Sequence, residues 1–169
     1  ININIVNTKA IIMDLDNTIY LVSSIGEVLF ESLFQLIAES GEFSGSLENV
    51  KAEIMRRPFQ YVANDYSFSE NLKTRSMELL HNLTYEAPIR TVENYETLRE
   101  IPCRKFLVTT GFTKMQNSKI DRLGIRNDFE EIYIIDPSVT ALSKRDIFKK
   151  ILVRHELKTD EVLVVGDDY

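Results

Sequence analysis

The architecture is constrained most strongly by Ala10-Ile11-Ile12-Met13, an apolar run that leads directly into Asp14-Leu15-Asp16-Asn17-Thr18. A short, continuous apolar run is typical of a strand that is covered on both faces, as in a parallel sheet. Three further runs of this kind follow, at residues 106–108, 132–135 and 162–165. The sequence therefore predicts an α/β fold with a parallel sheet at its centre.

Helical patterns separate the last three of these runs. Thr113-Lys114-Met115-Gln116 has the spacing of a capping box, and apolar residues follow it at helical spacing. Ser143 to Asp146 repeats the same spacing ahead of the next helix. Strands and helices thus alternate in βαβαβ order, which favours parallel pairing of the strands.

The segment between the first and second runs contains no convincing strand. We expect helices near residues 24–40, 46–57 and 69–82, the first of them beginning at a capping box on Ser24 and the second ending at Pro58. An all-helical insert of about 70 residues is too long for an ordinary connection between strands. The length indicates a separate unit.

We therefore expect an all-helical cap over residues 21–92, inserted after the first strand, and a core formed by residues 1–20 and 93–169. The chain ends at Tyr169, just past the last apolar run, where a domain of this kind normally continues. The C-terminal part of the core is accordingly expected to be missing.

Asp14 and Asp16 stand two residues apart at the end of the first predicted strand, where parallel sheets bind ligands. Two close carboxylates repel each other unless a cation or a shared proton offsets their charge. One carboxylate of such a pair can attack phosphorus, while the other protonates the leaving oxygen and then activates water. The spacing alone is a weak indication, because Asp is common in turns.

Residues after the second run can cradle a phosphate, since a strand end followed by a helix start offers hydrogen-bond donors. The Thr109 hydroxyl and the N–H groups of Thr110 and Gly111 are the candidate donors. Lys144 stands in the first turn of the following helix, where the helix dipole disfavours a cation. Such a lysine is easier to explain if it faces an anion.

The last run ends in a second acidic cluster, Gly166-Asp167-Asp168. Several carboxylates at one edge of a sheet are costly without a metal ion. Mg²⁺ prefers oxygen ligands and keeps several of its waters. We therefore expect a Mg²⁺ site at this edge, with Asp14, Asp16, Asp167 and Asp168 as its candidate ligands.

In this order, strand-Asp-x-Asp, strand-Thr, Lys and strand-Gly-Asp-Asp, the elements resemble the four-motif pattern of the haloacid dehalogenase superfamily. The resemblance covers residues 9–20 and 104–168. It implies a Rossmann-like parallel sheet flanked by helices, with the active site at the carboxyl ends of the strands. The helical insert resembles the family's cap, which closes over the substrate.

The resemblance also implies a role for each motif residue. Asp14 would be the nucleophile that forms an aspartyl-phosphate, and Asp16 would be the general acid and base, with its main-chain carbonyl on Mg²⁺. Thr109 would bind the transferring phosphoryl group. Lys144 would neutralise charge between Asp14 and the phosphate. The paired acids of the last motif would hold Mg²⁺: Asp167 as a ligand and Asp168 in support.

Asp16 sorts the chain within this family, because the dehalogenases lack an acid at that position while phosphatases and phosphomutases have one. The expected function is a Mg²⁺-dependent phosphohydrolase (a phosphoric monoester hydrolase) that acts on a small phosphorylated metabolite, such as a sugar phosphate or a nucleotide. A phosphomutase is the alternative. A phospho-receiver signalling domain is less favoured, because no strand-end Asp stands between Tyr20 and Thr109.

The composition argues against several other classes of protein. The 169 residues have a net charge of −6 and no basic stripe that would favour nucleic acid. No apolar run approaches the ~20 residues of a membrane span. Cys103 is the only cysteine, so we expect no disulfide within the chain and a cytoplasmic location. The oligomeric state is left open.

Two arginines of the predicted cap allow two interpretations. Arg56 and Arg57 stand just before Pro58, where they would either contact the leaving group of the substrate or end a helix in solvent. The sequence favours the solvated helix end.

Overall fold

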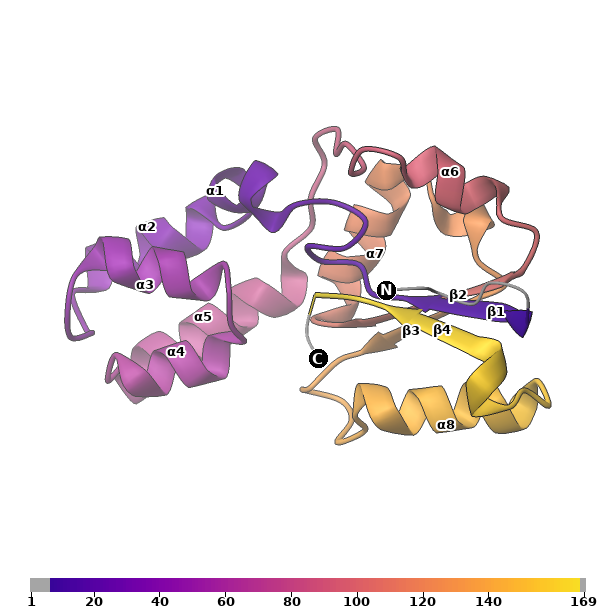
Figure 1. Ribbon diagram of the computed structural model, residues 1–169. Helices are drawn as coiled ribbons and strands as arrows, with labels where there is room; N and C mark the ends of the chain where they lie inside the picture. Colours follow the sequence, from indigo (N-terminus) through magenta and orange to yellow (C-terminus); the bar gives the residue numbers. More distant parts are fainter. Residues whose placement is uncertain (1–6, 168–169) are drawn as a thin grey trace.

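The computed structural model in Figure 1 describes residues 7–167. Its centre is a parallel sheet with the strand order β3-β2-β1-β4. The strands are β1 (Ala10–Met13), β2 (Arg104–Thr110), β3 (Glu131–Ile135) and β4 (Val162–Val165). The predicted α/β fold with a parallel sheet is confirmed, and each predicted apolar run lies within a strand.

Both faces of β1 are buried, because successive side chains of a strand point to opposite sides of the sheet. Ile11 and Met13 belong to a large hydrophobic cluster on one face. Ala10 and Ile12 belong to a second cluster, which includes Ile147 on the other face. This double burial is the physical reason for the continuous apolar run before Asp14.

Helices cover the sheet on both faces (Figure 1). On one face lie α6 (Tyr95–Glu100) and α7 (Thr113–Leu123), and on the other lies α8 (Lys144–Arg154). The connections include the short 3₁₀ segments η2 (Val22–Ser24), η3 (Arg126–Asp128) and η4 (Thr159–Glu161). The arrangement is the predicted sheet flanked by helices.

The order of the strands reverses beside β1. The chain passes from β1 to β2 and β3 on one side, and α8 then carries it across to β4 on the other side. Ligands of open α/β sheets bind at such a reversal, outside the carboxyl ends of the strands. Met13 pairs with Val165 at the ends of β1 and β4. The acids that follow these two strands therefore come to the same edge.

Five α-helices between β1 and α6 lie beside this edge of the sheet (Figure 1). They are α1 (Gly26–Leu29), α2 (Glu31–Ser40), α3 (Leu47–Ile54), α4 (Phe59–Asp65) and α5 (Glu70–Asn82). The helical content of the insert agrees with the prediction, but α4 has no counterpart in it, because a helix so short shows little periodicity. No helix within residues 7–167 has the length and apolarity needed to cross a membrane.

The capping box predicted at Ser24 does not form. Ile25 precedes α1 without a side-chain cap, and the Ser24 hydroxyl donates to the Leu21 carbonyl instead. Ser46 and Ser69 cap α3 and α5 through their side chains. Capping spacing alone therefore does not locate these helix starts.

The proposed division into a core (1–20 and 93–169) and a cap (21–92) stays a prediction. The two connections to the insert meet where the Val92 N–H donates to the Ile19 carbonyl (2.7 Å), beside both predicted boundaries. One hydrophobic cluster nevertheless extends from β1 through α2 to α5. The insert is thus packed against the core, with α5 beside α7, as well as connected to it.

Candidate active site

Asp14 directly follows β1 and is buried, with 9% of its surface exposed. Its N–H donates to the Val165 carbonyl (2.9 Å), which continues the pairing with β4. Oδ1 accepts the N–H of Leu15 (2.8 Å), and Oδ2 lies 2.6 Å from Lys144 Nζ. Burial raises the pKa of the Asp14 carboxyl, although Lys144 acts in the opposite direction. The carboxylate is therefore held at both oxygens.

Lys144 reaches Asp14 from the first turn of α8. The start of this helix is fixed by the predicted capping box, in which Ser143 and Asp146 exchange side-chain and backbone hydrogen bonds. The helix dipole opposes a cation at this position. The ion pair with Asp14 offsets that cost. Asp14 is thus an anion that explains the position of Lys144.

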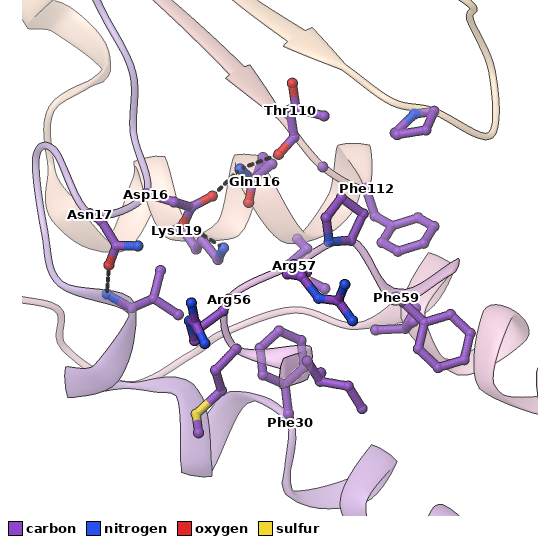
Figure 2. A pocket seen from close by; sticks show the side chains of 18 of the residues that line it. Asp16, Asn17, Phe30, Arg56, Arg57, Phe59, Thr110, Phe112, Gln116 and Lys119 are labelled. Carbon is purple, nitrogen blue, oxygen red and sulfur yellow. Dashed lines mark hydrogen bonds and ion pairs between the residues drawn. The ribbon is translucent and has the colours of Figure 1, made fainter. Parts of the chain in front are cut away.

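Asp16 faces α7 rather than Asp14. Lys119 Nζ lies 2.9 Å from its Oδ1, and Gln116 Nε2 donates to its Oδ2 (2.8 Å), as Figure 2 shows. The Tyr20 hydroxyl also donates to Oδ1. Burial alone would raise the pKa of Asp16, but Lys119 and the hydrogen bonds from Tyr20 and Gln116 outweigh burial and lower it. These contacts favour the ionised carboxylate.

Gln116 and Lys119 are not among the site residues predicted from the sequence. Both are buried, with 1% and 4% of their surfaces exposed. One feature of the sequence could have revealed them: they stand beside Met115 and Ile120, which form the apolar face of the same helix. Long polar residues on a buried helix face need partners, and here the partner is Asp16.

The capping box predicted at Thr113–Gln116 is wrong for the same reason. The Gln116 side chain turns into the site, so it does not reach back to cap the helix. Asp136, from the end of β3, takes over: its Oδ2 accepts both the N–H (2.8 Å) and the hydroxyl (2.9 Å) of Thr113. The start of α7 is thus fixed by a residue distant in sequence.

The predicted phosphate-binding residues follow β2. Thr109 is fully buried, and its hydroxyl oxygen accepts a hydrogen bond from Gln116 Nε2 (2.7 Å). Thr110 and Gly111 line the cavity. The Gly111 N–H already donates to the Ile135 carbonyl (3.0 Å), contrary to the expectation that it is available to a phosphate. A Cβ at position 111 would lie 2.9 Å from Gln116 Cδ, so the glycine leaves room for the Gln116 side chain.

The candidate metal ligands have the right chemistry for Mg²⁺. Asp167 is exposed and lines the same cavity as Asp14 and Asp16, while Asp168 lies outside the described residues. Within residues 7–167, no three acidic, histidine or cysteine side chains gather into a cluster. Mg²⁺ needs only one or two carboxylates, because it keeps several waters. An oxygen-only set of two carboxylates and the Asp16 carbonyl therefore fits this ion.

The site opens into a cavity of about 360 Å³ between the sheet edge and the helical insert. The insert contributes much of its apolar wall: Val22, Phe30, Ile54, Met55, Pro58, Phe59 and Leu80. Figure 2 shows Phe30 and Phe59 together with Asp16 and Gln116 around this space. A concave, largely apolar site with a few convergent polar groups suits a small molecule.

Arg56 and Arg57 also border the cavity. Arg57 forms ion pairs with Glu53 (2.6 Å from Nε to Oε2) and Asp65 (2.7 Å from Nη2 to Oδ2). Arg56 lies 3.1 Å from Glu53, and 74% of its side chain is exposed. The two arginines lie just past the end of α3, after its C-cap Met55, and also line the cavity. The two interpretations of this pair therefore do not exclude each other.

Comparison with known families matches residues 8–169 to the haloacid dehalogenase-like hydrolases. The match spans almost the whole chain and includes all four motifs. No curated protein sequence matches this chain.

Several solved structures share the fold. A proposed phosphatase from Clostridium difficile is 18% identical, with a TM-score of 0.70 over 94% of this chain and 75% of that one. A proposed β-phosphoglucomutase from Thermotoga maritima is 17% identical (TM-score 0.58, covering 93% and 75%). The L-2-haloacid dehalogenase from Xanthobacter autotrophicus is 13% identical (0.51, covering 93% and 69%). Because three reactions occur on one fold, the fold does not select among them.

Proposed function

Since the chain belongs to the haloacid dehalogenase-like hydrolases, we propose that it is a phosphohydrolase. Its substrate would be a small phosphorylated metabolite, and the phosphoryl group would pass through an aspartyl-phosphate on Asp14. The observation that carries the proposal is the pair of carboxylates after β1, each held by its own lysine beside one cavity.

Asp16 is what favours phosphate chemistry over dehalogenation. A halide leaves carbon as a stable anion and needs no proton. The oxygen of an alkyl phosphate leaves as a poor, basic anion, so a nearby acid that protonates it speeds the reaction. The same group, once deprotonated, can activate the water that hydrolyses the aspartyl-phosphate. Asp16 lines the cavity beside Asp14 and is the residue proposed for both steps.

Asp14 is proposed as the nucleophile because it lines the cavity with its orientation fixed. Leu15 and Lys144 hold its two oxygens. Lys144 is proposed to contact the phosphoryl oxygens as well, which would reduce repulsion between the two anions. Thr109 and the N–H of Thr110 are the proposed further contacts of the phosphoryl group.

Mg²⁺ is the proposed cofactor. Asp14, Asp167 and the main-chain carbonyl of Asp16 would hold it, with Asp168 in support. Bound Mg²⁺ would offset the negative charge of the phosphoryl group and of these carboxylates. A cytoplasmic location is also proposed, because a chain with a single cysteine forms no disulfide of its own.

The test is phosphate release from a panel of sugar phosphates, nucleotides and aryl phosphates, with Mg²⁺ or with EDTA. Wild type is compared with Asp14→Asn and with Asp160→Asn, a matched control in the exposed segment η4. We expect release that needs Mg²⁺, falls by at least about 1,000-fold in Asp14→Asn and is unchanged in Asp160→Asn. Release by Asp14→Asn at the wild-type rate would contradict the proposal.

The same panel separates the alternatives. Isomerisation of a sugar phosphate without net release of phosphate would point to a phosphomutase. A stable phosphorylated Asp14 without turnover would point to a receiver-like role.

A further inference from the structure

Two buried polar residues of α7, Gln116 and Lys119, have no place in the roles assigned so far. Burying a long side chain with a charged or amide end costs conformational freedom and hydration. Both residues stand one turn apart on the helix, so they share a face. The face they share is the one that packs against the sheet beside Met115 and Ile120. Their burial therefore needs a specific explanation.

Their contacts converge on one carboxylate. Each oxygen of Asp16 has its own donor from α7: Lys119 Nζ at 2.9 Å from Oδ1, and Gln116 Nε2 at 2.8 Å from Oδ2 (Figure 2). Tyr20 adds a third donor at Oδ1, and its ring lies 5.7 Å from Lys119 Nζ. Hydrogen bonds to an ionised group are the stronger kind. Two fixed donors on a rigid helix determine both the position and the plane of the carboxylate.

Gln116 also joins the two halves of the site. Its Nε2 donates to Thr109 Oγ1 (2.7 Å) as well as to Asp16, so the amide spans the ends of β1 and β2. The glutamine Oε1 is buried without a hydrogen-bond partner among residues 7–167. Leaving a buried acceptor unpaired is unfavourable. The amide keeps this orientation because its other end bonds a carboxylate.

The neighbouring chain leaves room for this amide. A Cβ on Gly111 would approach Gln116 Cδ to 2.9 Å and Cγ to 3.0 Å, closer than side chains tolerate. A residue other than glycine at this position would displace the glutamine. The turn after β2 and the side chain on α7 are thus matched to each other.

We propose that Gln116 and Lys119 are positioning residues that fix the Asp16 carboxyl group for its reaction with the leaving group. The inference rests on the proposed function, in which Asp16 passes a proton to the leaving oxygen as the bond to phosphorus breaks. Without these donors, Asp14 would repel Asp16, and the carboxylate would turn away from the cavity. Neither Gln116 nor Lys119 needs to touch the substrate.

The test uses two substrates of nearly equal shape that differ in their need for an acid. The para-nitrophenolate ion leaves readily without a proton, whereas phenolate is a poorer leaving group and gains from protonation. The ratio kcat/KM is measured for para-nitrophenyl phosphate and phenyl phosphate, because it covers the step in which the leaving group departs. The variants are Lys119→Met and Gln116→Met, which remove the donors and keep the length of the side chain.

We expect kcat/KM for phenyl phosphate to fall about 100-fold in Lys119→Met, and by less than about 10-fold for para-nitrophenyl phosphate. Loss of the lysine charge raises the pKa of Asp16, so the expected fall comes from the lost position of the carboxyl group and not from a lower protonated fraction. Gln116→Met should shift the two substrates in the same direction by a smaller factor, and it serves if Lys119→Met does not fold. Lys114→Met, on the exposed side of the same helix, is the matched control and should leave both values unchanged. Circular dichroism and Tm establish that each variant is folded.

A double variant ties the effect to Asp16. Asp16→Asn should show the same dependence on the leaving group, and Asp16→Asn combined with Lys119→Met should be no slower than Asp16→Asn alone, because both changes remove one function. Equal falls for both substrates, or additive losses in the double variant, would overturn the inference and leave the proposed function intact. A wild type that hydrolyses neither substrate would overturn both.

Discussion

At the scale of single residues, Asp14 and Asp16 carry the same functional group in different surroundings. Burial dominates at Asp14 and raises its pKa, whereas Lys119, Tyr20 and Gln116 outweigh burial at Asp16 and lower its pKa. A cation beside a carboxyl lowers its pKa further, and a neighbouring anion raises it. The protonation of this pair during turnover would thus depend on the substrate and on the proposed Mg²⁺ as well as on the protein.

The Lys144–Asp14 pair leads to a prediction about activity. Lys144→Met should lower kcat/KM for phosphate release by about 100-fold, because one preorganised positive charge beside the transferring group is lost. Lys149→Met, at an exposed position of the same helix, is the control and should have no effect. Steady-state phosphate release checks both. Equal activity of the two variants would remove Lys144 from the reaction.

At the scale of elements, α7 is the helix that shapes the site, and Asp136 fixes its start. Burial alone would raise the pKa of Asp136, but hydrogen bonds from Ser138 and Thr113 lower it below its usual value. A carboxyl with a lowered pKa in the folded state stabilises the fold at pH values above the unfolded pKa of about 3.9. That stabilisation is lost as the pH falls through the lowered pKa of the folded protein.

Asp136→Asn should therefore destabilise the protein by about 1 kcal/mol near neutral pH, since an ionised helix cap is replaced by a neutral one. The difference from wild type should shrink below about pH 4, where the wild-type carboxyl also becomes neutral. Thermal unfolding followed over a series of pH values measures this. A difference in Tm that stays constant down to the lowest pH would contradict the assigned role of the charge.

The elements also show where sequence reasoning succeeds and where it does not. The strands were predictable because β1 is buried on both faces, which only a continuous apolar run allows. The capping box at Ser143 forms, but the one at Thr113 does not. The Gln116 side chain donates to Asp16 instead, and Asp136 accepts the N–H of Thr113 in its place. Local spacing cannot reveal a partner that is 100 residues away in the chain, as Asp16 is from Gln116.

At the scale of the whole molecule, the cavity is a product of two parts of the chain that lie side by side. The sheet edge supplies the carboxylates, and α7 and α8 supply Lys119 and Lys144. The insert supplies apolar side chains together with Arg56 and Arg57. The order of the motifs made the carboxylates and Lys144 predictable. The contribution of the insert depends on how it packs against the sheet edge, which no short motif encodes.

Arg56 provides a prediction at this scale. Its exposed guanidinium borders the cavity with a carboxylate on one side only, so it has donors to offer a substrate. Arg56→Ala should raise KM about 10-fold for substrates that carry a negatively charged group in addition to the phosphate, and should change KM little for those that do not. Comparing phenyl phosphate with its carboxylated analogue measures this effect. Equal KM changes for the two compounds would show that Arg56 does not contact the additional charged group and lies in solvent at the end of a helix.

The central claim is that the phosphoryl group is transferred to Asp14, and its most direct test is to trap that intermediate. The enzyme is mixed with a readily hydrolysed substrate and Mg²⁺, quenched in acid during turnover, digested and analysed by mass spectrometry. We predict one added phosphoryl group on the peptide that contains Asp14, absent from Asp14→Asn and from samples with EDTA. Turnover that proceeds without any phosphorylated peptide, or with the phosphoryl group on another residue, would contradict it.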